Sequence, residues 1–169
     1  MTSATYRILL VMSTTRWTKA LVEHAIEEAA AADAAGKTVE LDVLYIIEQD
    51  ELDRVYRSVG GGAFLGTKPQ AEITSLLLQE HMRVAARRIE EARRAVEDRG
   101  FATVEREVTG NYEQEVRKAA QEGHYDVILL SRTDQPFMSR FFFGSDTDRV
   151  ARWVSKEGYG KVIVEDTES

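Results

Sequence analysis

Short apolar runs alternate along the chain with longer segments of helical periodicity, and this alternation restricts the fold more than any other feature of the sequence. Segments with apolar residues three and four positions apart, which are typical of helices, separate the runs. The predicted strands are Tyr6 to Met12, Val39 to Ile47, Ala102 to Val108, Tyr125 to Leu130 and Lys161 to Val164. Strands that alternate with helices predict right-handed crossovers. We therefore expect an α/β fold with an open, mostly parallel five-stranded sheet and helices on both faces.

The length of 169 residues fits one hydrophobic core, so we expect a single domain over residues 1–169. The longest helical pattern spans residues 71–98, and we expect an apolar stripe that includes Met82 and Ala85 to face the core. The segment 58–70 contains four glycines and Pro69, which predicts a flexible loop. Within it, residues 61–68 are similar to a phosphate-binding loop, but no strand leads into them, so we expect a connector.

The composition excludes several classes of function. The net charge of −7 argues against a nucleic-acid surface, because phosphate binding requires a basic face. No cysteine is present, and His24, His81 and His124 are far apart in the sequence, so we expect no disulfide and no metal site. The apolar runs are too short to cross a membrane, and no signal peptide precedes the first of them. We expect a cytoplasmic protein without membrane contact.

In parallel α/β sheets, ligands bind beyond the carboxyl ends of the strands, at the point where the strand order reverses. Two loops of this chain follow strands at that edge, Ser13 to Trp17 after the first strand and Ser131 to Ser145 after the fourth. We expect a binding site between these loops. Trp17 could cover such a cleft, but we prefer the interpretation that it packs against Met12 or the loop.

Three segments of the sequence resemble the universal stress protein family. The segment ILLVMSTTRWTKAL, which starts at Ile8, resembles the family's first strand and helix. Asp126 to Asp134 resembles its fourth strand, and Ser139 to Val150 resembles its phosphate loop and the following helix. The resemblance implies a Rossmann-like fold, a role in the stress response, and a homodimer formed through the C-terminal strand, residues 161–164.

The family's nucleotide signature is Gly, two residues, Gly, nine residues, Gly, and then Ser or Thr. The spacing is intact here, but Ser131 and Asp134 replace two glycines, and Met12 occupies the position of the family's nucleoside-facing Asp. A carboxylate at Asp134 would repel a polyphosphate. Gly144 and Ser145 are retained, and a serine at a helix start also serves as an N-cap. The resemblance implies these ATP-site positions: Met12, Ile46, Ser131, Asp134, Gly144 and Ser145.

Basic residues surround the same loop. Arg132 and Arg140 could contact a phosphate or a carboxylate through paired hydrogen bonds. Alternatively, the arginines of this region pair with the neighbouring acids Asp134, Asp146 and Asp148. The short-range mixture of acids and bases favours this second interpretation.

No sequence pattern typical of an enzyme is present, neither a nucleophile elbow nor a pair of catalytic carboxylates. The sequence therefore favours a non-catalytic regulatory or interaction module of the stress response, with weak or no ATP binding and no cofactor. One alternative is an ATP-binding switch of the universal stress type that uses magnesium and hydrolyses ATP slowly. Another is a protein that binds a different small anionic metabolite in the same cleft.

Overall fold

The computed structural model of the chain describes residues 3–60, 70–133 and 145–166. Strands and helices alternate along these ranges, apart from two consecutive helices after the second strand. The elements are β1 (Thr5–Ser13), α1 (Lys19–Ala34), β2 (Thr38–Glu48), α2 (Gln49–Gly60), α3 (Gln70–Glu97), β3 (Thr103–Gly110), α4 (Tyr112–Gly123), β4 (Val127–Ser131), α6 (Asp146–Glu157) and β5 (Lys161–Glu165).

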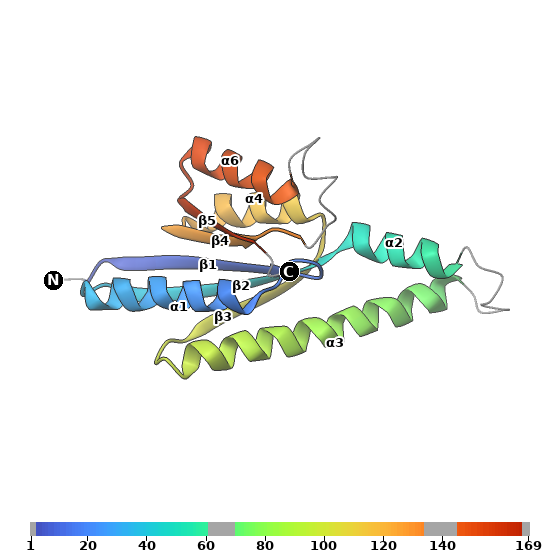
Figure 1. Cartoon of the computed structure of the whole chain (residues 1–169), viewed down its shortest axis with the longest axis horizontal. Helices are drawn as coiled ribbons and strands as arrows, with labels where there is room; N and C mark the ends of the chain where they lie inside the picture. The colour runs from blue at the N-terminus through green and yellow to red at the C-terminus, as the bar shows by residue number, and fades with distance from the viewer. Residues whose placement is uncertain (1–2, 61–69, 134–144, 167–169) are drawn as a thin grey trace.

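The strands form one sheet in the order β3-β2-β1-β4-β5, and every pair of neighbours is parallel. The predicted α/β fold with a parallel five-stranded sheet is therefore confirmed. The strand bounds differ from the predicted ones by at most two residues. Helices cover both faces of the sheet (Figure 1). This double cover explains why the central strands are apolar on both sides.

Alternate residues of β1 belong to two separate cores. Ile8, Leu10 and Met12 pack in a core with side chains of α1 and α3, which we call the α1–α3 core. Leu9 and Val11 pack in a core with side chains of α4 and α6, which we call the α4–α6 core. The period of two residues in a strand produces this division, since successive side chains point to opposite faces.

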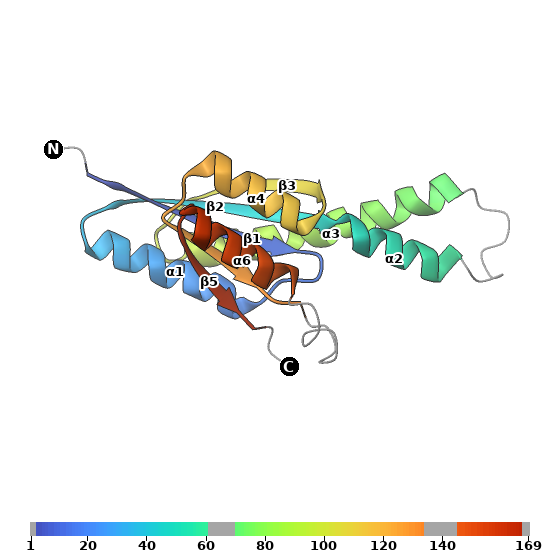
Figure 2. The ribbon, with the colours of Figure 1, turned by 90° about the horizontal axis from the view of Figure 1, so that it is seen from above.

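The helices α2 and α3 extend beyond the carboxyl edge of the sheet (Figures 1 and 2). The later part of α3 lies against the sheet, where Ala85, Ala92 and Val96 are buried as the apolar stripe predicts. Met82, which belongs to the same predicted stripe, is 46% exposed. The prediction for Met82 is therefore wrong, although Leu78, one turn earlier in the same stripe, does pack against the α1–α3 core.

The loop predicted at 58–70 is partly helical at its ends, because α2 continues to Gly60 and α3 begins at Gln70. Residues 61–69 lie outside the described residues, and with them the segment that is similar to a phosphate-binding loop. Within the described ranges, no helix is both long enough and apolar enough to cross a membrane.

Candidate functional site

The candidate site lies at the carboxyl edge of the sheet, where β1 and β4 are neighbours. The chain leaves β1 toward α1 on one face and leaves β4 toward α6 on the other face (Figure 1). In open parallel sheets this divergence creates the ligand crevice. The loop after β1 reaches the first turn of α6, where Arg16 contacts Thr147.

Arg16, in the loop after β1, occupies the centre of this crevice and is only 4% exposed. Its Nε donates to Thr147 Oγ1 at 3.1 Å, and Thr147 Oγ1 in turn donates to the carbonyl oxygen of Ser131 at 3.0 Å. The guanidinium carbon lies 3.8 Å from the centre of the Tyr112 ring. Arg16 thus connects β1, α4, β4 and α6 through one side chain.

Glu48, the last residue of β2, neutralises Arg16. Its Oε2 lies 2.7 Å from Arg16 Nη1, and the carboxylate is also almost fully buried. Its Oε1 accepts hydrogen bonds from the Ser13 hydroxyl, the Thr15 hydroxyl at 2.8 Å and the Thr15 amide at 3.2 Å. A buried charge is stable only when it is paired and hydrogen-bonded, and Glu48 is paired through Oε2 and hydrogen-bonded through Oε1.

Tyr112 closes the crevice from the side of α4. Burial raises the pKa of its hydroxyl to about 12, although the nearby Arg16 charge acts in the opposite direction. The phenol is therefore neutral at physiological pH, and its ring contributes a cation–π contact rather than a charge. Side chains of the chain itself, Arg16, Glu48 and Tyr112, fill the crevice at this depth.

The N-terminus of α6, the predicted phosphate-binding position, is capped by its own first turn. The Ser145 hydroxyl accepts from the Asp148 amide at 3.1 Å and donates to Asp148 Oδ2 at 2.6 Å. Asp146 and Asp148 place two carboxylates in this turn, which suits the positive end of the helix dipole. An incoming phosphate would meet these carboxylates and would compete with Ser145 for the amide.

Arg132 is held by acids on both sides. Its Nε and Nη2 donate to Asp148 at 3.0 and 2.9 Å, and its Nη1 donates to Asp166 at 2.7 Å. Burial opposes ionisation of Asp148, but the hydrogen bonds from Arg132 and Ser145 prevail and lower the pKa of this carboxyl. Arg149 is likewise engaged with Asp146 and Glu113. These contacts agree with the interpretation that arginines and acids of this region pair with each other.

The other predicted site residues do not share one surface. Ser131 is fully buried at the end of β4, and its hydroxyl has no hydrogen-bond partner in the described part of the chain. Ile46 is buried in the α4–α6 core, on the side of the crevice. Met12 is buried in the α1–α3 core, on the opposite face of the sheet. The structure thus brings Ser131, Ser145 and Arg132 together and leaves Met12 apart.

Some predicted site residues fall in a segment that the structure does not describe. Asp134, Arg140 and Gly144 lie between residues 134 and 144, outside the described residues. Their roles therefore remain those that the sequence predicts.

Trp17 packs against the α1–α3 core, which contains Met12, and does not cover the crevice. Arg88 of α3 holds this region, because its Nη1 donates to the carbonyl oxygens of Ser13 and Thr14 and to the Tyr45 hydroxyl. The guanidinium carbon of Arg88 lies 5.6 Å from the centre of the Trp17 ring. The interpretation of Trp17 as a packing residue agrees with these contacts.

Sequence reasoning missed the central pair of the crevice. Arg16 lies in a loop that the sequence did single out, but nothing in the sequence marks this arginine as buried. Glu48 offers a better signal, since an acid directly after a run of buried strand residues must find a partner. Among the residues that the structure describes, no group of three or more acids and histidines is arranged to hold a metal ion.

The fold and the position of this crevice define the class of α/β proteins with a ligand site at the carboxyl edge of a parallel sheet. The family model described as the universal stress protein family matches residues 5–156. The chain belongs to the universal stress protein family. A search of curated proteins found no match.

Solved structures with the same fold include that of the hypothetical protein MJ0577, whose biochemical function was assigned from its structure. That protein is 21% identical to this chain, with 97% of each chain covered and a TM-score of 0.58. A universal stress protein in complex with cAMP is 14% identical, with 98% of this chain and 100% of that chain covered and a TM-score of 0.52. A family member from Burkholderia pseudomallei is 16% identical, with 94% of each chain covered and a TM-score of 0.50. At these identities the similarities show the fold.

Proposed function

We propose that this chain is a non-catalytic regulatory or interaction module of the stress response whose crevice binds ATP weakly or not at all. The buried Arg16–Glu48 ion pair supports this proposal, because it fills the crevice from within. A nucleotide would have to displace it, and breaking a buried pair costs about 3–5 kcal/mol.

The rim of the crevice supports the same conclusion. The Ser145 hydroxyl both donates to and accepts from Asp148, and Arg132 is already shared between Asp148 and Asp166. The groups that could hold a phosphate are therefore engaged with carboxylates of the chain itself.

Calorimetric titration of the purified protein with MgATP tests the proposal. We expect no saturable heat up to about 1 mM nucleotide, since that concentration corresponds to only about 4 kcal/mol of binding free energy. The variant Ser131→Gly/Asp134→Gly restores the family's glycines and should bind MgATP at least about tenfold more tightly, which is about 1.4 kcal/mol. Micromolar affinity of the unmodified protein would overturn the proposal.

A nucleotide-binding switch is the second candidate, and one observation favours it. The Ser131 hydroxyl is buried at the crevice without a partner among the described residues, and a buried polar group without a partner usually has one in another state. One relative of the same fold was solved in complex with cAMP. Nucleotide retained through purification, detected by mass spectrometry, would support a switch, and Gly144→Asp should then abolish retention. Titrations with cAMP and with inorganic phosphate test whether the crevice accepts another anion instead.

We also propose that the chain forms a homodimer through β5, an edge strand of the sheet. The Lys161 amide donates to the Asp126 carbonyl oxygen, and the Glu165 carbonyl oxygen accepts from the Arg132 amide. Lys161 and Glu165 therefore direct their backbone groups toward β4. Val162 and Val164 alternate with these residues along the strand, so their backbone N–H and C=O groups point toward the free edge of the sheet.

Antiparallel pairing of two β5 strands about Ile163 suits this arrangement. Val162 of one copy then lies opposite Val164 of the other, so that their outward backbone groups can exchange hydrogen bonds. Lys161 lies opposite Glu165 of the second copy, which is a favourable cross-strand charge pair. Light scattering at tens of micromolar protein, about tenfold above a micromolar dissociation constant, should report a dimer. A monomer at that concentration would contradict the proposal.

A further inference from the structure

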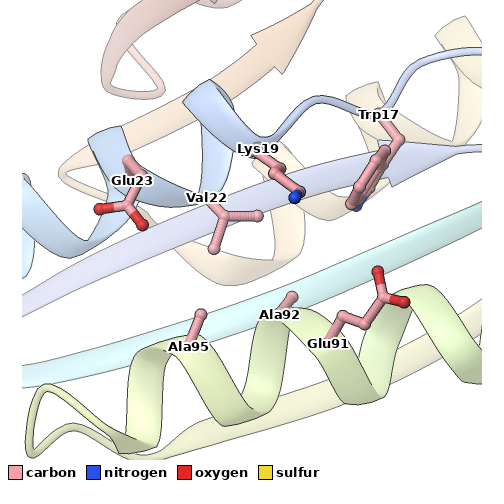
Figure 3. Close-up of a pocket in the computed structure, with 7 residues that line it drawn as sticks. All are labelled: Trp17, Lys19, Val22, Glu23, Glu91, Ala92 and Ala95. Carbon is pink, nitrogen blue, oxygen red and sulfur yellow. The ribbon is translucent and has the colours of Figure 1, made fainter.

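A second pocket lies on the other face of the sheet, between α1 and α3 (Figure 3). Its volume is about 360 Å³, which lies within the range of small-molecule sites. Val22, Ala92 and Ala95 form its apolar lining, and the two alanines leave the space open because their side chains are short. The Arg16–Glu48 crevice belongs to the opposite face, so the two sites are separate.

The loop after β1 and the start of α1 contribute an aromatic ring and an exposed cation to this pocket. The Trp17 indole nitrogen Nε1 is buried and has no hydrogen-bond partner among the described residues. The Lys19 ammonium also lines the pocket, and it forms no ion pair within the described chain. Lys19 is the first residue of α1, where the helix dipole disfavours a positive charge. An anion in the pocket can pair with this exposed lysine, although Glu23 lies one turn further along α1 in the same lining.

The opposite wall contributes an unused acceptor. Glu91 of α3 points into the space below Trp17 (Figure 3) and forms no ion pair with the described residues. Glu23, which also lines the pocket, is closer to satisfied, because its carboxylate lies 3.9 Å from Arg99. The pocket therefore combines an exposed cation, an exposed anion and an aromatic ring around an apolar lining.

We propose that this pocket binds a free α-amino acid with an apolar side chain. A carboxylate beside Lys19 and an ammonium beside Glu91 would each form an ion pair, with the Trp17 ring as a wall of the pocket. The apolar side chain would lie on Val22 and Ala95. A ligand with only one charge would leave either Lys19 or Glu91 unpaired. A dicarboxylate would be repelled by Glu91, and a diamine would be repelled by Lys19.

Nuclear magnetic resonance of the full-length ¹⁵N-labelled protein offers a direct test, since the chain has only two indole N–H signals, from Trp17 and Trp153. Trp153→Phe assigns them. Titration with L-leucine should shift the Trp17 signal saturably, with a dissociation constant below about 1 mM for a ligand of this size. The Trp153 signal, on α6, should not move.

Two fragments of leucine separate its charges. 4-Methylpentanoate lacks the ammonium and 3-methylbutylamine lacks the carboxylate, and each should bind at least about tenfold more weakly than leucine, the effect of one charged hydrogen bond. Lys19→Ala should weaken leucine and 4-methylpentanoate but not the amine. Glu91→Gln should weaken leucine and the amine but not the acid.

Controls of the same type lie on the other face of the sheet. Lys118→Ala and Glu122→Gln change exposed residues of α4 and should leave leucine binding unchanged. Ala95→Leu, which fills the lining, should abolish the Trp17 shift. The proposal is overturned if leucine shifts neither indole signal or both equally, or if the two fragments shift Trp17 as strongly as leucine does.

Discussion

At the scale of single residues, the buried pair of Arg16 and Glu48 is the feature that distinguishes this chain. Both residues are less than a tenth exposed, and each is held by several partners from different elements. Such pairs add little net stability over an apolar pair, but removal of one member leaves a buried charge without compensation. The pair thus constrains the crevice to one arrangement, and its members should respond strongly to substitution.

Glu48→Gln should lower the free energy of unfolding by about 3 kcal/mol, because the amide cannot neutralise the buried Arg16. Urea denaturation measures this change. The double variant Arg16→Met/Glu48→Gln should recover part of the loss, since it removes both charges. As a control, Glu40→Gln breaks an ion pair with Arg7 in which the acid is more than half exposed, and it should cost less than about 1 kcal/mol. If Glu48→Gln and Glu40→Gln lower the free energy of unfolding equally, the buried pair contributes no more to stability than the exposed one.

The pH dependence of stability should report the contacts of Asp148. Its pKa is lower in the folded chain than in the unfolded chain, because its hydrogen bonds to Arg132 and Ser145 outweigh the effect of burial. The ionised carboxylate therefore stabilises the fold at neutral pH, and this contribution is lost as the pH falls below about 4. The stability difference between the unmodified protein and Asp148→Asn should shrink over that range. A difference that stays constant down to pH 3 or so would argue against these contacts.

At the scale of elements, the two edge strands of the sheet differ in their capacity to pair. The sequence of β3 from Thr103 to Thr109 is TVEREVT, which reads the same in both directions. A two-fold antiparallel pair centred on Glu105, Arg106 or Glu107 would place that residue opposite itself, and like charges opposite each other are destabilising. β5 has the sequence KVIVE, and its central Ile163 brings unlike charges together instead. Charged residues thus protect the β3 edge and leave the β5 edge available.

Helix α3 should also behave as two parts. Val96 is fully buried against the sheet, and Val96→Ala should lower the free energy of unfolding by about 2 kcal/mol through lost burial and a residual cavity. Met82 is nearly half exposed, and Met82→Ala should change stability by less than about 0.5 kcal/mol. Thermal unfolding of both variants gives the comparison. Similar losses would mean that the outer part of α3 packs as tightly as the inner part.

At the scale of the whole molecule, the parallel sheet separates two sites. The crevice with Arg16 and Glu48 opens at the carboxyl edge beside the α4–α6 core, and the pocket with Trp17 lies against the α1–α3 core. The short loop after β1 supplies a side chain to each of them, Arg16 to the first and Trp17 to the second. A β5-mediated dimer would join two such molecules beside the rim of the crevice, because Asp166, which follows β5, pairs with Arg132.

Val164→Pro tests the β5 dimer without altering a charge. Proline removes one outward N–H group, which pairs with the second copy in the proposed register but with nothing in β4. We expect this variant to be a monomer by light scattering. Val164→Thr retains the amide and the branched shape, so it should remain dimeric. Dimerisation of Val164→Pro with the affinity of the unmodified protein would exclude this strand as the interface.

The sequence by itself determined the elements and the class of fold, because strand and helix periodicity are local properties that each segment carries alone. It also located the ends of β1 and β4 to within one residue, since these follow directly from the apolar runs. It failed for Met82, because helical periodicity alone does not show which residues of an apolar stripe meet a neighbouring element.

Only the tertiary structure decided how the crevice is filled. Arg16 lies in the loop after β1, and Glu48 is the last residue of β2. Their pairing depends on the strand order β2-β1-β4 and on the placement of α6. The same holds for the Trp17 pocket, whose walls come from α1 and α3. Contacts between residues distant in the sequence arise from packing of whole elements, and no local pattern encodes them.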